Sequence, residues 1–210
     1  MRGAIFDVDG TLLCSMDAWY NAVANFFKVR NIDYDKAQME SFKAMPLEES
    51  LPIIKRDYNL DMSMHDILKE LMELVRIEYE ENIPAKKGAY EYFKKLHNDG
   101  VKIAIATSGY KELCEGAFRR LGMWEYIDAC AFSTEVMKNK SHPDVYLLAA
   151  ERIGVAPHDC TVFEDITIGI SGAKKGGFYT VAVADESNID EQDELKQIAD
   201  RFITDFTELL

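Results

Sequence analysis

Two aspartates stand two residues apart near the start of the chain. Asp7 and Asp9 follow the apolar run 3–6 and precede Gly10 and Thr11. Residues i and i+2 of an extended chain point to the same side, roughly 7 Å apart. Two aligned carboxylates at the end of a buried strand suit a site that binds a cation and handles a phosphate group.

Polar residues also follow the later apolar runs. Thr107 with Ser108, Lys140, and Glu164 with Asp165 each stand at or shortly after the end of such a run. Ligands of open parallel sheets bind outside the carboxyl ends of the strands. The sequence therefore predicts that one edge of a sheet collects carboxylates, a hydroxyl and a lysine.

This set of residue types favours phosphoryl chemistry. Clustered carboxylates raise one another's pKa, and a divalent cation relieves that repulsion. All-oxygen ligands favour Mg²⁺, which often bridges to a substrate phosphate, while a lysine and a hydroxyl can hold the remaining phosphate oxygens. One aspartate can act as a nucleophile that forms an aspartyl-phosphate, and a second can protonate the leaving oxygen and then activate water.

The same residues allow other interpretations. An EF-hand calcium loop needs glycine at its sixth position and glutamate at its twelfth, whereas here Gly10 stands fourth and Ala18 twelfth. Thr107 could cap the following helix as well as bind a phosphate. Lys138 competes with Lys140, and only the spacing to the following Pro-Asp pair favours Lys140.

Strand and helix patterns alternate along most of the chain. The expected strands are 3–6, 101–106, 129–132, 161–163, 179–184 and 201–203. The expected helices between them are 90–98, 111–121, 143–153 and 166–175. Such alternation indicates βαβ units, so we predict an α/β fold with a Rossmann-like parallel sheet flanked by helices.

One stretch near the N-terminus breaks the alternation and shows helical patterns only. These patterns lie at 17–30, 35–44, 46–58 and 64–81. We predict a helical cap domain over 14–84, inserted into an α/β core domain made of 1–13 and 85–210. Because the insertion leaves at the edge where the polar residues gather, we expect it to cover the site.

Composition excludes several classes of function. The net charge of −13 disfavours binding to nucleic acid or to an anionic membrane surface. The four cysteines are scattered without a CxxC pair, so a zinc site is not expected. The sequence shows no signal-peptide pattern and no apolar stretch of membrane-spanning length, so it predicts a cytoplasmic protein. We expect a monomer or a weak dimer.

These residues, in this order, resemble the haloacid-dehalogenase-like (HAD) superfamily of phosphotransferases. Within it, the chain is similar to the phosphatases and beta-phosphoglucomutase-like enzymes that carry a helical cap after the first strand. The resemblance covers essentially the whole chain. Its four motifs are Asp7-Val8-Asp9-Gly10-Thr11, Thr107, Lys140 before Pro143-Asp144, and Phe163-Glu164-Asp165 with Gly169-Ile170.

The resemblance implies a role for each motif residue. Asp7 would be the nucleophile and Asp9 the general acid and base. The implied Mg²⁺ ligands are Asp7, the backbone carbonyl of Asp9, Asp165 and, directly or through water, Glu164. The implied phosphoryl-binding groups are Thr107, Lys140 and the backbone N–H of Ser108.

Several positions depart from the family's pattern, and three of them bear on the substrate. Cys14 stands where relatives usually have Asp or Asn, and Trp19 where mutase-like members carry a cap histidine. Leu47 stands where those members carry an arginine that grips a second phosphate. These departures favour a Mg²⁺-dependent phosphatase of a small phosphorylated metabolite, such as a sugar phosphate. The alternative is a sugar-phosphate mutase, and Trp19 is also a candidate for lining the substrate pocket.

Two further alternatives fit the sequence less well. Haloacid dehalogenases of this family lack the second aspartate of the first motif, whereas Asp9 is present here. Receiver-like domains, which only accept a phosphoryl group on an aspartate, lack a cap. In such an architecture the cap and its contacts would select the phosphorylated metabolite.

Overall fold

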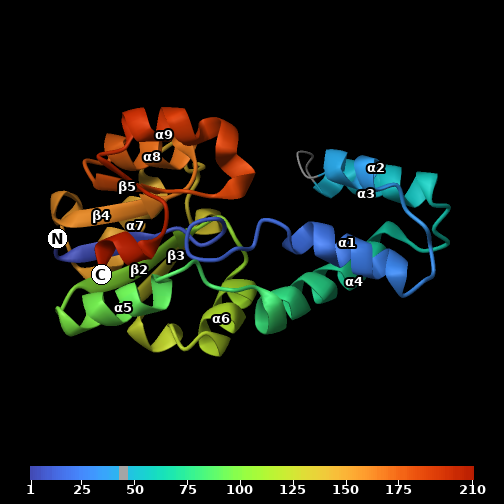
Figure 1. Cartoon of the computed structure of the whole chain (residues 1–210), viewed down its shortest axis with the longest axis horizontal. Coiled ribbons are helices and arrows are strands. Elements are labelled where there is room, and N and C mark those ends of the chain that lie inside the picture. The colour runs from blue at the N-terminus through green and yellow to red at the C-terminus, as the bar shows by residue number, and fades with distance from the viewer. Residues whose placement is uncertain (43–46) are drawn as a thin grey trace. The chain divides into compact units, whose positions relative to one another are not determined.

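The apolar runs of the sequence form the strands of a single parallel sheet. The computed structural model describes residues 1–42 and 47–210, with the side chains of 40–48 excepted. Within these residues the sheet has six strands, all paired in parallel. They are β1 Gly3–Phe6, β2 Lys102–Thr107, β3 Ala129–Phe132, β4 Cys160–Glu164, β5 Tyr179–Val183 and β6 Arg201–Ile203. The predicted α/β fold is confirmed (Figure 1).

The strand order places a switch point at the first strand. The order is β3-β2-β1-β4-β5-β6, so the chain builds outward from β1 in one direction and then in the other. Phe6 lies level with Ile105 of β2 and with Phe163 of β4. Ligand sites of such sheets lie at this reversal, outside the carboxyl ends of the strands. The residues that directly follow β1 and β4 are therefore expected to form the ligand site.

Both faces of the sheet are buried, which explains why the strands read as continuous apolar runs. Adjacent residues Ile5 and Phe6 point to opposite faces, and both are inaccessible to solvent. Ile5 packs with Tyr146 and Ala149 of α7. Phe6 stacks on Phe163, with ring centroids 4.4 Å apart.

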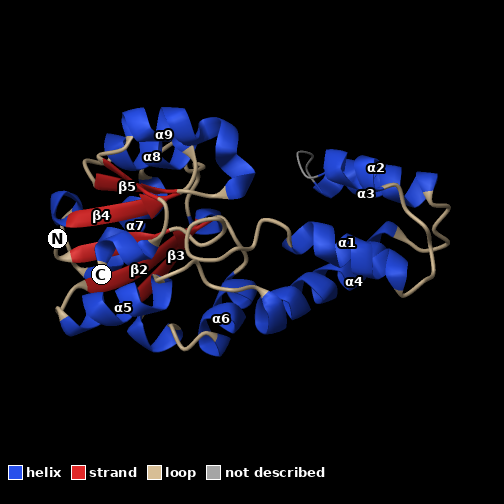
Figure 2. Cartoon of the chain, in the orientation of Figure 1, coloured by secondary structure: helices blue, strands red, loops and turns tan. Residues whose placement is uncertain are grey.

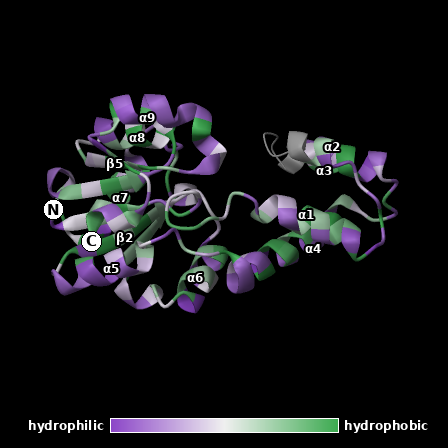
Figure 3. Cartoon of the chain, in the orientation of Figure 1, coloured by the Kyte–Doolittle hydropathy of each residue, from purple (hydrophilic) through white to green (hydrophobic). Residues whose placement is uncertain are grey.

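Helices connect the strands and cover the two faces of the sheet (Figure 2). They are α5 Ala89–Asn98, α6 Lys111–Arg120, α7 Asp144–Ile153, α8 Thr167–Lys175 and α9 Gln192–Ile198. The sequence patterns did not predict α9, whose sequence QDELKQI offers mostly polar residues. Figure 3 accordingly shows α9 largely in hydrophilic colours, and Leu195 is its buried residue.

A second compact unit consists of helices. The chain divides into Met1–Ser15 with Pro84–Leu210, and Met16–Ile83. The described helices of the second unit are α1 Ala18–Lys28, α2 Lys36–Phe42, α3 Leu47–Asp57 and α4 Met64–Ile77. Their buried core includes Phe26, Phe27 and Leu71. That this unit acts as a cap, with boundaries at 13/14 and 84/85, stays a prediction.

The predicted helix 64–81 has a different form at its C-terminal end. After α4 the helical hydrogen bonds widen into a π-helical turn over Glu78–Asn82. The predicted ends of the second and third helices of the insertion, Ala44 and Pro46, lie outside the described residues.

Candidate active site

Asp7 continues the line of β1 into a buried polar site. Its backbone N–H donates to Phe163 O at 3.0 Å, which extends the pairing with β4 by one residue. The side chain is 6% exposed, and its Oδ1 forms an ion pair with Lys140 Nζ. Thr11 Oγ1 donates to Asp7 Oδ2 at 3.3 Å. The first predicted site residue is therefore buried and bonded on both of its oxygens.

The tight turn after Asp7 brings the first motif against the fourth. Leu12 N and Leu13 N both donate to Val8 O at 2.9 Å. Gly10 has a φ of +83°, and a Cβ at this position would overlap the carboxylate of Asp165. Only glycine combines that backbone angle with such a close approach. The turn also aims Thr11 Oγ1 at Asp165 Oδ1, 2.9 Å away.

Lys140 links the first and fourth motifs. Its side chain is 7% exposed, and Nζ donates to Asp7 Oδ1 and, at 2.5 Å, to Glu164 Oε1. Burial works to lower the pKa of Lys140, but the Asp7 and Glu164 carboxylates outweigh it and raise that pKa above its ordinary value. Lys138, the competing lysine, is exposed. Lys140 is therefore the lysine that reaches the carboxylates.

Glu164 and Asp165 lie at the end of β4, beside Asp7. Glu164 is inaccessible to solvent, and its Oε1 accepts from Tyr146 Oη at 2.8 Å. Burial raises the pKa of Glu164 to about 7, against the opposing effect of Lys140. Burial, together with the Asp7 and Glu164 carboxylates, raises the pKa of Asp165 well above its ordinary value.

These groups fit a divalent cation. Oxygen atoms of Asp7, Glu164 and Asp165 lie within 4.8 Å of one another, the one such group of potential ligands found in the described part of the chain. Three carboxylates meet a single ammonium there. Glu164 Oε2 is also buried with no hydrogen-bond partner. A buried carboxylate oxygen left unpaired is costly, and a hard cation that prefers oxygen ligands, such as Mg²⁺, would satisfy it.

Asp9 is predicted to bind the metal through its backbone carbonyl, and that stays a prediction. Its side chain is not one of the three clustered carboxylates. Its Oδ1 accepts from Ser15 Oγ at 2.6 Å. A Cβ on Gly109 would come within 2.9 Å of Asp9 Oδ2 and 3.3 Å of Thr107 Oγ1, so Asp9 lies near the loop that follows β2.

Thr107 and Ser108 form the start of that loop. Thr107 is buried, and its Oγ1 accepts from Gly109 N at 2.9 Å. The N-cap of α6 is Tyr110, so Thr107 does not cap that helix. Ser108 Oγ lies 2.9 Å from Ser133 Oγ, which follows β3.

The residues that depart from the family's pattern are described each within its own unit. Trp19 belongs to the helical unit, where it is half-buried against that unit's core. Cys14 is exposed, and partial burial of its thiol raises its pKa. The side chain of Leu47 lies outside the described residues. The roles assigned to these positions stay predictions.

Four residues that contact the predicted site residues were not predicted from the sequence: Thr11, Ser15, Tyr146 and Asn188. Thr11 stands inside the first motif, so its place in the run was a usable signal. Tyr146 reaches Glu164 from α7 and Asn188 reaches Asp165 from the segment after β5, at separations of 18 and 23 residues. No local pattern marks such contacts between separate elements.

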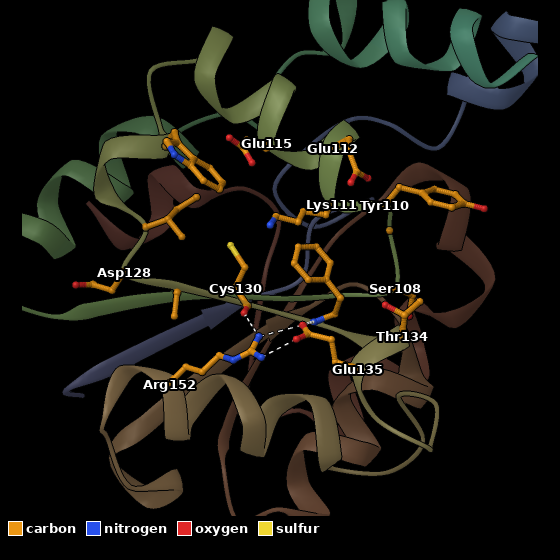
Figure 4. Close-up of a pocket in the computed structure, with 15 residues that line it drawn as sticks. Ser108, Tyr110, Lys111, Glu112, Glu115, Asp128, Cys130, Thr134, Glu135 and Arg152 are labelled. Carbon is orange, nitrogen blue, oxygen red and sulfur yellow. Dashed lines mark hydrogen bonds and ion pairs between the residues drawn. The ribbon is translucent and has the colours of Figure 1, made fainter. Parts of the chain in front are cut away.

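A hollow of about 870 Å³ opens beside the site, along the edge strand β3 (Figure 4). It begins at Ser108 and Gly109, and none of the three clustered carboxylates lines it. Arg152 and Glu135 both line it and form an ion pair, with Nη2 and Oε2 2.6 Å apart. The hollow therefore borders the predicted phosphate-binding loop without containing the carboxylate site.

The described helices can also be compared with the requirements of a membrane span. None of them combines the length and the apolar character that a membrane span requires.

Sequence comparison finds relatives that are named as phosphatases or as a mutase. The chain is 28% identical over 181 residues to "Phosphorylated carbohydrates phosphatase" of Thermotoga maritima, covering 86% of this chain and 84% of that protein. It is 29% identical over 188 residues to a fructose-1-phosphate phosphatase of Escherichia coli, with 86% and 95% covered. It is 28% identical over 193 residues to the beta-phosphoglucomutase of Bacillus subtilis, with 87% and 83% covered.

Solved structures share the fold. A Thermotoga maritima protein provisionally assigned as a beta-phosphoglucomutase matches with a TM-score of 0.87 and 26% identity, over 97% of this chain and 94% of the other. CbbY of Rhodobacter sphaeroides, solved with phosphate, matches in fold with a TM-score of 0.77 at 24% identity, over 100% and 96%. The family model described as "Haloacid dehalogenase-like hydrolase" matches residues 4–183. The chain thus belongs to the haloacid dehalogenase-like hydrolase family, as the resemblance of its motifs predicted.

Proposed function

We propose that the protein is a Mg²⁺-dependent phosphatase that hydrolyses a small phosphorylated metabolite, of the sugar-phosphate class, through an aspartyl-phosphate on Asp7. The observation that carries this proposal is the environment of Asp7. Its carboxylate bonds to Lys140 and Thr11 and lies within 4.8 Å of ligand atoms of Glu164 and Asp165. The names of the phosphorylated-carbohydrate and fructose-1-phosphate phosphatases among its relatives support the substrate class.

In the first half of the reaction, a carboxylate oxygen of Asp7 attacks the phosphorus atom of the ester. A bond forms between this oxygen and phosphorus, and the bond between phosphorus and the leaving alkoxide oxygen breaks. Asp9, in its protonated form, gives its proton to that alkoxide, which departs as an alcohol. The product on the enzyme is an acyl phosphate, and Asp9 is left as a carboxylate.

In the second half, water attacks the phosphorus atom of the acyl phosphate. Asp9 accepts a proton from the water, the bond to the Asp7 oxygen breaks, and inorganic phosphate is released. Asp7 then returns to its carboxylate form and Asp9 to its acid form, so the protons balance. The hydroxyl of Ser15, 2.6 Å from Asp9 Oδ1, holds the Asp9 side chain.

The remaining groups bind and neutralise charge. Asp7, Glu164 and Asp165 would hold Mg²⁺, which neutralises the phosphoryl oxygens when it is bound. Lys140 supplies an ammonium beside Asp7, and the Thr107 hydroxyl with the Ser108 N–H would bind phosphoryl oxygens. Phosphoryl transfer depends mainly on such positioning and neutralisation.

A sugar-phosphate mutase is the alternative, because the Bacillus subtilis beta-phosphoglucomutase is among the relatives. Mutase-like members carry an arginine that binds a second phosphate group, and Leu47 stands at that position here. This difference supports the phosphatase reaction over the mutase reaction. Product analysis separates the two: inorganic phosphate from a panel of sugar phosphates supports the phosphatase. Isomerised sugar phosphate without phosphate release, in the presence of a bisphosphate activator, supports the mutase.

Asp7→Asn tests the mechanism. The amide cannot form an acyl phosphate, so turnover in saturating Mg²⁺ should fall to background, while Mg²⁺-free thermal unfolding shows that the variant folds. Asp193→Asn, a change at a 93% exposed side chain on α9, is the matched control and should keep full activity. Full activity of Asp7→Asn, with reversion to Asp excluded by mass spectrometry, would contradict the proposal.

A further inference from the structure

Asn188 reaches the carboxylate site from a segment that belongs to none of the four motifs. Its Nδ2 donates to Asp165 Oδ2 at 2.6 Å, while the other oxygen of Asp165 accepts from Thr11. We propose that Asn188 is a positioning residue that orients Asp165 for the divalent cation. The inference deepens the proposed function and rests on it, since it concerns the same cation.

The backbone after β5 is built to present this amide. Asp185 Oδ1 accepts from Ser187 N at 2.9 Å and so fixes the start of the 3₁₀ segment Glu186–Glu191. Asn188 departs from helical geometry inside that segment, with φ −114° and ψ 29°. Asn188 therefore lies at a kink between two helical stretches of the segment, not inside a regular turn.

The same segment also holds the helix that follows Asp165. Glu191 Oε2 accepts from Thr167 N at 2.8 Å and from Thr167 Oγ1 at 2.7 Å, at the first residue of α8. Asn188 and Glu191 thus hold the two ends of the short link from Asp165 to α8. A displacement of this segment would move Asp165 relative to Asp7.

The chemistry of the two donors explains why they orient Asp165 without replacing the cation. The Thr11 hydroxyl and the Asn188 amide are neutral, so they fix the plane of the carboxylate and leave its negative charge uncompensated. A lysine or arginine in place of Asn188 would neutralise that charge and compete with a cation. Outer partners of this kind commonly change metal affinity by 10- to 100-fold when they are removed.

Two variants test the inference in the full-length protein. Asn188→Ala removes the amide, and Asn188→Leu keeps a similar volume but provides no donor. Calorimetric titration with Mg²⁺ alone should show at least a tenfold weaker affinity for both. In the activity assay, the Mg²⁺ concentration for half-maximal rate should rise while kcat at saturating Mg²⁺ recovers. Asn98→Ala, an exposed asparagine at the end of α5, is the control and should match the wild type.

The outcomes separate this inference from the proposed function. If wild type binds Mg²⁺ and both variants bind it within twofold of wild type, the positioning role is wrong and the proposed function stands. The same conclusion holds if the variants only lower the melting temperature in EDTA. If Asn188→Ala weakens Mg²⁺ binding but Asn188→Leu binds Mg²⁺ like the wild type, the loss comes from packing. That result would also overturn the positioning role of Asn188. Absence of Mg²⁺ binding by wild type would overturn the cation itself.

Discussion

At the scale of single residues, the site is defined by an imbalance of charge. Asp7, Glu164 and Asp165 lie together, and Lys140 supplies one ammonium to them. Water does not reach Glu164, and this burial raises its pKa to about 7. Lys140 offsets part of the repulsion, and a divalent cation would offset the rest.

Lys140→Met tests this charge arrangement because methionine has a similar length and no charge. We expect kcat/KM for a phosphate ester to fall by about 10²- to 10³-fold, the loss typical of one donor to developing charge. Lys138→Met is the matched control, since that lysine is exposed and two residues earlier. A loss of activity in Lys138→Met with normal activity in Lys140→Met would reverse the assignment.

At the scale of elements, the edge strand β3 is covered by an ion pair. Arg152 Nη1 donates to Cys130 O, and Glu135 Oε1 accepts from Phe132 N at 2.9 Å. In a strand, residues two apart point their backbone groups to the same side. Cys130 and Phe132 point theirs to the outer side, and Ala129 and Ala131, which alternate with them, point theirs toward β2. Arg152 and Glu135 therefore occupy groups that a strand of another chain could pair with.

The double variant Glu135→Ala/Arg152→Ala should expose this edge and increase self-association. Sedimentation velocity over a range of protein concentrations measures it, with a larger weight-average mass expected for the variant. Glu115→Ala/Arg119→Ala removes another Arg–Glu pair, one formed within α6, and it should behave as wild type. Equal masses for both double variants would show that the pair does not protect the edge.

Elements and contacts could be predicted from the sequence where a local residue pattern records them. The strand β1 was predicted at its observed bounds because Ile5 and Phe6 are buried on opposite faces, which produces an uninterrupted apolar run. Asp7 and Glu164 were predicted to approach because they end parallel strands. Tyr146 and Asn188 were missed because their contacts depend on how α7 and the segment after β5 are packed, and spacing along the chain does not record that.

At the scale of the whole molecule, the chain leaves the α/β unit after Ser15 and returns at Pro84. The two crossing segments are held together within the α/β unit. Cys14 N donates to Pro84 O at 3.0 Å, and Lys86 N donates to Leu12 O at 2.7 Å. The segments that flank the helical unit in sequence are therefore fixed to each other and to the turn that carries the first motif.

Lys86 then ties the returning segment to the sheet. Its Nζ lies 2.6 Å from Asp185 Oδ2 and donates to Ala184 O at 2.9 Å, just after β5. Burial works to raise the pKa of Asp185, but the hydrogen bonds from Lys86 and Ser187 outweigh it and lower that pKa. A carboxyl whose pKa is lower in the folded than in the unfolded state stabilises the fold when it is ionised.

The sign of this effect predicts a specific loss of stability in acid. The contribution of Asp185 should be fully present above its unfolded pKa, near 3.9, and should disappear as pH falls through the lower folded value. Asp185→Asn should therefore reduce the free energy of unfolding in urea by about 1.5–3 kcal/mol at pH 7, and by much less near pH 2. Asp193→Asn, at the exposed position on α9, should change it little at either pH. An equal deficit of Asp185→Asn at both pH values would show that the side chain acts by packing rather than by its charge.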